Sequence, residues 1–123
     1  MKRILIVDDA ATVRMYYRSI LETAGYMVIE AVNGIEALEK VVQEEFDLYI
    51  VDINMPKLDG YGFMSELRRM DLPQVPAIMV STEAASNDRM RAYSAGANFY
   101  LVKPVKPAEL LTNCRLLLGE ALS

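Results

Sequence analysis

The chain has 123 residues, of which 53% are apolar and 24% are charged, values typical of one globular domain and not of a disordered or fibrous protein. Its formal net charge of −4 disfavours binding to nucleic acid, which depends on a basic face, so we expect protein partners and no nucleic acid. The sequence contains no histidine, which excludes a Ser-His-Asp triad, an imidazole base and a histidine metal site.

Five short apolar runs rich in β-branched residues predict strands, and a segment of helical periodicity follows each run. Gly25 is placed to end the first helix, Asn33 and Glu36 predict a capping pair for the second, and Pro107 marks the start of the last. The strands are expected at residues 4–7, 27–29, 48–51, 77–80 and 99–102, the first helical face at Val13, Tyr17, Ile20, Leu21 and Ala24, and the last at Leu110, Leu111, Cys114, Leu117, Leu118 and Ala121.

This alternation predicts an α/β fold over residues 1–123, a doubly wound, five-stranded parallel sheet with helices on both faces. No apolar run approaches the roughly 18 residues that cross a bilayer, and the run at 4–7 ends at two aspartates instead of continuing as a signal peptide. Cys114 has no second cysteine with which to form an internal disulfide, which fits a reducing compartment. We therefore expect a cytoplasmic protein without membrane contact.

Polar residues gather where the predicted strands end, which is the edge at which sheets of this kind bind ligands. Each of these residues has a plainer interpretation alone, as a turn, a helix N-cap or an ordinary loop. Their joint placement at one edge favours a shared site. The residues are Asp8 and Asp9 after the first strand, Asp52 after the third, Ser81 and Thr82 after the fourth, and Lys103 after the fifth.

Three crowded carboxylates repel each other and raise one another's pKa values, and they form a good site for a hard divalent cation. Oxygen ligands point to magnesium or calcium. Mg²⁺ fits best because it commonly takes one or two carboxylates together with phosphate oxygens, which suits phosphoryl chemistry. Lys103 adds a positive charge that can bind a phosphoryl oxygen.

These residues resemble the response-regulator receiver domain. The resemblance is carried by residues 4–9, 51–56, 59–60, 80–81 and 95–104, and the length is similar to that of the single-domain, CheY-like members. It implies a flavodoxin-like strand order of 2-1-3-4-5 and a role in two-component signalling, in chemotaxis or a related phosphorelay. The chain would then be a phosphoacceptor switch and not an enzyme, although it would promote its own phosphorylation and dephosphorylation.

The resemblance also implies a role for each site residue. Asp52 would accept a phosphoryl group from a histidine kinase or phosphotransfer protein, in a reaction that requires Mg²⁺. The cation would be held by Asp8, Asp9, Asp52 and the backbone carbonyl of Asn54. Lys103, joined to Pro104 by a cis peptide, would bind a phosphoryl oxygen, while Ser81 and Tyr100 would act as switch residues, with Tyr100 turning inward on phosphorylation. The output surface would be the fourth helix, fifth strand and fifth helix, with Arg91, Ser94, Phe99, Asn113 and Leu116 as reporters.

Three departures from the family pattern narrow these expectations. Thr82 is bulkier than the alanine or glycine common after the switch hydroxyl, so it hinders access to the phosphoryl group. Asn98 and Phe99 stand where the DNA-binding branch often carries acidic residues that pair across a dimer, so we expect a monomer. Asn113 and Leu116 lie where motor-binding regulators tend to be basic, which argues against flagellar-motor binding and leaves the downstream target open.

Three other functions compete with a signalling switch. A magnesium phosphohydrolase of the haloacid-dehalogenase type would need an aspartate where Asn54 stands. A nucleotide or flavin binder would need glycines or hydroxyls in place of Asp8 and Asp9. An adaptor that works without phosphorylation would have no use for a complete acceptor site.

Overall fold

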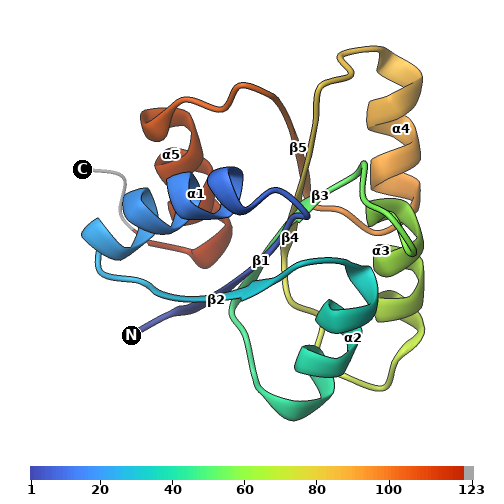
Figure 1. The fold of residues 1–123 in the computed structure, drawn as a ribbon, viewed down its shortest axis with the longest axis horizontal. Helices are drawn as coiled ribbons and strands as arrows, with labels where there is room; N and C mark the ends of the chain where they lie inside the picture. The colour runs from blue at the N-terminus through green and yellow to red at the C-terminus, as the bar shows by residue number, and fades with distance from the viewer. Residues whose placement is uncertain (121–123) are drawn as a thin grey trace.

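Strands and helices alternate along the whole described chain, and the sheet is covered on both faces (Figure 1). The computed structural model describes residues 1–120, so Ala121 of the predicted apolar stripe lies outside the described residues. The strands are β1 (Arg3–Val7), β2 (Met27–Ala31), β3 (Leu48–Asp52), β4 (Ala77–Ser81) and β5 (Phe99–Val102), and the helices are α1 (Ala11–Thr23), α2 (Gly34–Gln43), α3 (Gly60–Arg69), α4 (Ser86–Ser94) and α5 (Pro107–Leu118).

The five strands are all parallel and lie in the order β2-β1-β3-β4-β5, which confirms the order expected from the resemblance. The chain passes outward from β1 to β2 and then returns across β1 to β3. The order therefore reverses between β1 and β3, where ligands bind in open sheets of this type. The carboxyl ends of these two strands carry Asp8 and Asp52.

Alternate residues of each strand pack into two separate cores, because side chains point to opposite faces of a sheet in turn. Leu5 and Val7 face the core under α2, α3 and α4, whereas Ile4 and Ile6 face the core under α1 and α5. Figure 1 shows these two groups of helices on opposite sides of the sheet. Burial on both faces explains why the strands appear in the sequence as continuous apolar runs.

The helix-end signals in the sequence are confirmed. Asn33 Oδ1 accepts a hydrogen bond from Glu36 N at 2.9 Å, and Glu36 Oε1 accepts one from Val32 N at 3.1 Å. Pro107 is the first residue of α5, and the chain leaves that helix through Gly119, whose φ of +71° favours glycine.

Three strands are longer at their carboxyl ends than the apolar runs predict: β2 by Glu30 and Ala31, β3 by Asp52 and β4 by Ser81. Asp52 pairs with Val80, and Ser81 pairs with Val102, as the last residues of their ladders. An apolar pattern cannot reveal these strand ends, because a polar residue interrupts the pattern while its backbone still pairs with the neighbouring strand. The side chains of Asp52 and Ser81 are therefore fixed by the sheet and not by a loop.

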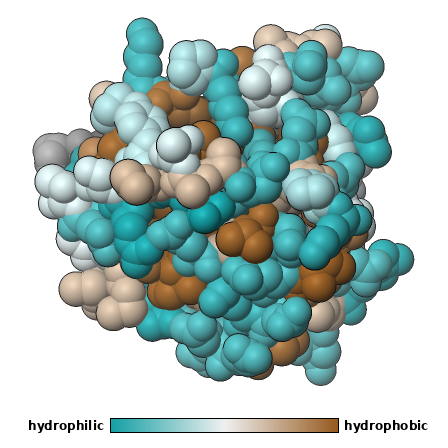
Figure 2. All heavy atoms as spheres, viewed as in Figure 1, coloured by the Kyte–Doolittle hydropathy of each residue, from teal (hydrophilic) through white to brown (hydrophobic). Residues whose placement is uncertain are grey.

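The surface is mainly hydrophilic, with isolated apolar side chains among charged ones on the face drawn in Figure 2. Met15, Val42, Met90 and Leu116 are among the exposed large apolar residues, and they come from four different helices. Within residues 1–120, no helix has both the length and the apolar character needed to traverse a bilayer.

Candidate functional site

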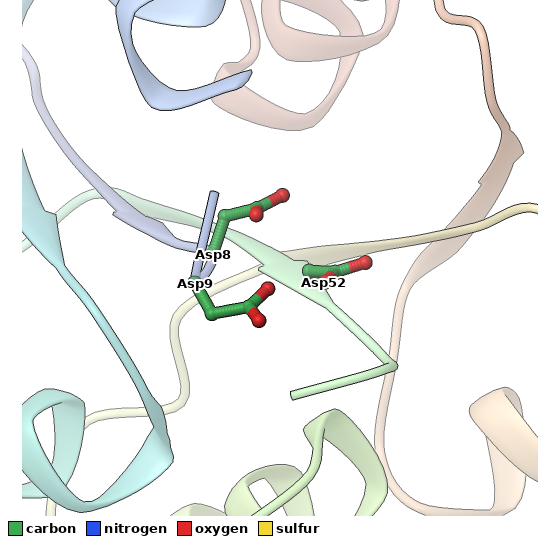
Figure 3. Close-up of side chains that lie close together, drawn as sticks. All are labelled: Asp8, Asp9 and Asp52. Atoms are coloured by element: carbon green, nitrogen blue, oxygen red, sulfur yellow. The ribbon is translucent and has the colours of Figure 1, made fainter. Parts of the chain in front are cut away.

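The carboxyl ends of β1 and β3 bring three carboxylates together. Figure 3 shows Asp8 and Asp9 leaving β1 and Asp52 leaving β3, with the three side chains facing the same space. Each offers one oxygen, and these oxygens all lie within 4.8 Å of one another. Asp8 and Asp52 are buried and Asp9 is exposed, so the cluster has a buried floor and one solvent-facing member.

Asp52 ends β3, the middle strand of the sheet, and only 5% of it is exposed. Burial is the largest cause of a raised pKa at this carboxyl. A hydrogen bond from Lys103 opposes the rise, and the charges of Asp8 and Asp9 add to it. Lys103 therefore offsets only part of the cost of burying the ionised form of Asp52.

Lys103 lies between two of the carboxylates. Its Nζ is 3.0 Å from Asp52 Oδ1 and 3.3 Å from Asp8 Oδ2. Burial lowers the pKa of Lys103, but the hydrogen bond with Asp52 and the charges of both carboxylates raise it above its ordinary value. The Lys103–Pro104 bond is cis, as expected, and Lys103 N donates to Ser81 O at 2.8 Å, which ties β5 to the end of β4.

Asp8 also has a local structural role. Its Oδ1 accepts from Ala10 N at 2.8 Å, while its backbone carbonyl accepts from Arg14 Nη1 at 2.7 Å. Arg14 is in turn paired with Glu30 at 2.8 Å. The helix N-cap of α1 is Ala10, which has no side-chain cap, so the N-cap interpretation of the aspartate pair is wrong and the turn interpretation holds for Asp8.

The loop after Asp52 returns directly onto the end of β3. A Cβ at Gly60 would lie 2.5 Å from Asp52 O and 2.8 Å from Ile53 Cα, so only glycine allows this approach. Gly60 N donates to Ile53 O at 2.9 Å, and Asp59 caps α3 through Gly62 N at 2.8 Å. The start of α3 thus packs against the backbone of Asp52. Asn54, in the loop between them, is exposed.

Ser81 and Tyr100 are both buried and are joined through the loop between β4 and α4. Ser81 Oγ accepts from Glu83 N at 3.1 Å, and the Tyr100 hydroxyl donates to Glu83 O at 2.6 Å. The Arg89 guanidinium lies 5.0 Å from the centre of the Tyr100 ring. Tyr100 is 1% exposed, so it already occupies the inward position that we expected it to reach only on phosphorylation; Thr82 is exposed.

The structure thus gathers Asp8, Asp9, Asp52 and Lys103 at one point, as the sequence predicts. It places Ser81 at the end of β4 and Tyr100 in β5, where both contact Glu83 of the β4–α4 loop. Sequence reasoning missed Arg14, Glu83 and Arg89. The Arg14 guanidinium donates to the backbone carbonyl of Asp8, and Glu83 acts through its own backbone N–H and carbonyl, so neither contact pairs two side chains whose types could signal it. Arg89 is one charged residue among several on α4.

The chemistry open to this arrangement follows from its charges. Three carboxylates and one ammonium leave a formal charge of −2, and every available ligand atom in the carboxylate cluster is oxygen. Such a donor set fits a hard divalent cation. With that cation present, an anionic group could approach Asp52 while Lys103 neutralised part of its charge.

Comparison with known proteins identifies the family to which this site belongs. The response regulator receiver domain model matches residues 4–115. The Guillardia theta protein named "Probable transcriptional regulator ycf27" is 42% identical over 95% of this chain and 45% of its own length. The Mycobacterium tuberculosis transcriptional regulatory protein PrrA is 40% identical over 94% of this chain and 49% of its own. The chain spans about half the length of these curated relatives.

Solved structures match over nearly their full length. Chemotaxis protein CheY4 of Vibrio cholerae aligns with a TM-score of 0.90 and 34% identity, covering 95% of this chain and 98% of that one. The receiver domain of the Pseudomonas aeruginosa sensor histidine kinase PA1611, solved with a magnesium ion coordinated in its active-site cleft, aligns with a TM-score of 0.89 and 32% identity, covering 97% and 98%. This chain belongs to the response regulator receiver domain family.

Proposed function

We propose that this receiver domain is a phosphorylatable switch in two-component signalling and that Asp52 is its phosphoacceptor. The observation that carries the proposal is the Asp52 carboxylate, which is 5% exposed, lies at the end of the central strand β3 and has Lys103 Nζ at 3.0 Å. The phosphoryl donor is the phosphohistidine of a histidine kinase or phosphotransfer protein.

In the transfer, an Asp52 carboxylate oxygen attacks phosphorus, and the bond between phosphorus and the donor imidazole breaks. Phosphoryl transfer depends mainly on alignment and charge neutralisation, and β3 and the close approach of Gly60 supply the alignment. Lys103 supplies positive charge where the phosphoryl oxygens arrive. The chain promotes its own phosphorylation and the later hydrolysis, but it acts as a switch and not as a turnover enzyme.

A magnesium ion fits this reaction and this site. Asp8, Asp9, Asp52 and the backbone carbonyl of Asn54 would hold it, and the all-oxygen carboxylate set within 4.8 Å supports that assignment. When bound, Mg²⁺ supplies positive charge for the phosphoryl oxygens and offsets repulsion among the carboxylates. Lys103 then separates from Asp8 or Asp52 to contact the incoming group.

Phosphorylation changes the β4–α4 loop through Ser81. The new phosphoryl group adds negative charge and acceptor oxygens beside Asp52, so the Ser81 hydroxyl exchanges its bond from Glu83 N for one to the phosphoryl group. Glu83 also receives the Tyr100 hydroxyl, which links this exchange to β5. The surface of α4, β5 and α5 changes in consequence and alters protein binding.

The output acts in the cytoplasm and through a protein target. Likeness to a chemotaxis protein over nearly its full length supports a motility-related phosphorelay. The curated relatives named as transcriptional regulators support a second candidate, control of transcription through a DNA-binding partner or segment. In both cases the net charge of −4 argues against direct contact between this domain and DNA.

Intact-mass measurement after incubation with acetyl phosphate tests the proposal. We expect one added phosphoryl group, only when Mg²⁺ is present, and none in a folded Asp52→Asn variant. Asp47→Asn is the matched control because Asp47 lies at the other end of β3. Labelling of Asp52→Asn at the wild-type level would exclude Asp52 as the acceptor.

A further inference from the structure

A second polar site lies at the amino ends of β4 and β5, opposite the edge that carries Asp52. A pocket of about 310 Å³ opens there, lined by Arg68, Gln74, Val75, Pro76, Gly96 and Asn98. Arg68 is the only charged residue of this lining. None of the proposed phosphorylation chemistry uses these residues.

The Arg68 side chain is held in one place by the loop before β5. Its Nε donates to Gly96 O at 3.1 Å, and one Nη donates to Asn98 Oδ1 at 3.2 Å. A Cβ at residue 96 would lie 2.5 Å from Arg68 Cγ, and Gly96 has a φ of +111°, so glycine both allows the turn and makes room for the arginine stem. The guanidinium is thus preorganised rather than free to move into solvent.

The positive charge of Arg68 is not neutralised within residues 1–120. No carboxylate of the described residues lies within ion-pair distance of it, whereas Arg69 next to it pairs with Glu66 at 2.6 Å. The two acceptors that hold Arg68 are neutral amide oxygens. Partial burial also lowers the pKa of the guanidinium, as expected for a cation that has lost water without gaining a counter-ion.

The positive charge of Arg68 remains without a counter-ion because the side chain that it contacts, Asn98, is a neutral amide. Its Oδ1 accepts from Arg68 and also from Ala77 N at 2.9 Å, so this side chain links α3, β4 and the start of β5 without adding negative charge. An aspartate there could make the same two bonds and would neutralise the arginine. Unused N–H groups of Arg68 and the amide groups of Asn98 and Gln74 are hydrogen-bond donors in the lining of one pocket.

We propose that this Arg68 pocket binds an oxyanion, a carboxylate or a phosphate, through the guanidinium and the neighbouring amides. A planar guanidinium matches two oxygens of such a group at once, and the half-buried setting strengthens the interaction. A bound oxyanion would bridge α3 and the segment before β5. The proposal does not depend on phosphorylation at Asp52.

Amide shifts of the full chain, followed during titration with sodium phosphate and separately with sodium acetate at constant pH and ionic strength, test it. We expect saturable shifts centred on Val75, Ala77, Gly96 and Asn98, and the tighter of the two anions identifies the source of the oxyanion. Arg68→Gln should weaken binding about tenfold or more, while Arg69→Gln, on the same helix, should leave it unchanged.

Asn98→Asp is the decisive second variant because it places a carboxylate on the arginine while keeping its size. We expect it to fold and to lose the anion response. Saturable shifts that persist in Arg68→Gln or in Asn98→Asp would overturn the proposal. So would the absence of any saturable shift at these amides in the wild type.

Discussion

Asp52 combines the opposing effects that define the site. Its carboxyl group is buried beside two other carboxylates, and the single ammonium of Lys103 offsets part of that cost. A buried acid whose ionised form is disfavoured weakens the fold at neutral pH. Stability therefore gives no reason for a carboxylate at this position, whereas the proposed phosphoacceptor role does.

The pH dependence of stability follows from the raised pKa of Asp52. Because the folded state holds this proton more tightly than the unfolded chain, the associated stability is present below the unfolded pKa and is lost as the pH rises through the folded pKa. We expect Asp52→Asn to have a higher free energy of unfolding than wild type at neutral pH, and the difference to vanish in acid. Urea unfolding across pH, without added divalent cation, measures both.

The exposed residue Asp71 provides the control for that experiment. Asp71→Asn should show no comparable pH-dependent difference. If wild type were instead more stable than Asp52→Asn at neutral pH, the interaction with Lys103 would outweigh the free-energy cost of burying the Asp52 carboxylate, and the prediction would be wrong.

Lys103 and Asp9 have roles that metal titration separates. Lys103→Ala should bind Mg²⁺ at least as tightly as wild type, because a positive charge leaves the neighbourhood of Asp8 and Asp52, yet it should lose phosphorylation-dependent output. Asp9→Ala should weaken Mg²⁺ binding by roughly tenfold or more. Lys106→Ala, an exposed lysine of the same loop, is the control. Equal loss of metal affinity in Lys103→Ala and Asp9→Ala would contradict these assignments.

At the scale of elements, the site depends on how closely α3 approaches β3. Gly60→Ala would force its Cβ against the backbone of Asp52 and Ile53, which cannot move without shifting the strand end. We expect it to cost roughly 1–3 kcal/mol of unfolding free energy and to slow labelling at Asp52. Thermal or urea unfolding, together with intact-mass time courses, measures the two effects.

Gly62→Ala is the matched control on the same helix. Its Cβ would meet Leu58 Cδ1, the flexible end of a side chain, at 2.6 Å, so a small rotation relieves the contact. Equal losses in the two variants would show that helix α3 tolerates no added methyl group and that the contact with Asp52 is not special.

The sequence predicts the strands and helices better than it predicts the contacts between side chains. The β-branched runs predicted every strand because burial on both faces leaves a continuous apolar pattern, and the family resemblance supplied the strand order. The inward position of Tyr100 could not be predicted, since it depends on the path of the β4–α4 loop and on the carbonyl of Glu83. The contacts of Lys103 with Asp8 and of Arg14 with the Asp8 carbonyl depend on side-chain conformations that have no periodicity.

At the scale of the whole molecule, two cores hold the sheet on both faces, while α4 buries only Ala92. The pairing of the sheet should therefore stay fixed on phosphorylation, and change should be concentrated in the β4–α4 loop and in the surface around α4, β5 and α5. A shift from 1:99 to 99:1 between two states takes about 5.5 kcal/mol, which is more than one new hydroxyl hydrogen bond supplies. We expect a partial shift that a binding partner completes.

Amide shifts with and without the phosphoryl mimic beryllofluoride measure this change, and sedimentation measures the oligomeric state. The reporters are Arg91, Ser94, Phe99, Asn113 and Leu116, and the protein should remain a monomer. Changes limited to the Asp52 loop would contradict a switch, and a dimer formed only with beryllofluoride would contradict the monomer.

The most direct test of the central claim is chemical mapping of the phosphorylated residue. Borohydride reduces an acyl phosphate of aspartate to homoserine, which peptide mass spectrometry locates in the sequence. After acetyl phosphate and Mg²⁺, we predict homoserine at Asp52 alone, and none when Mg²⁺ is omitted. Homoserine at Asp8 or Asp9, or modification without Mg²⁺ at the same level, would contradict Asp52 as the magnesium-dependent phosphoacceptor.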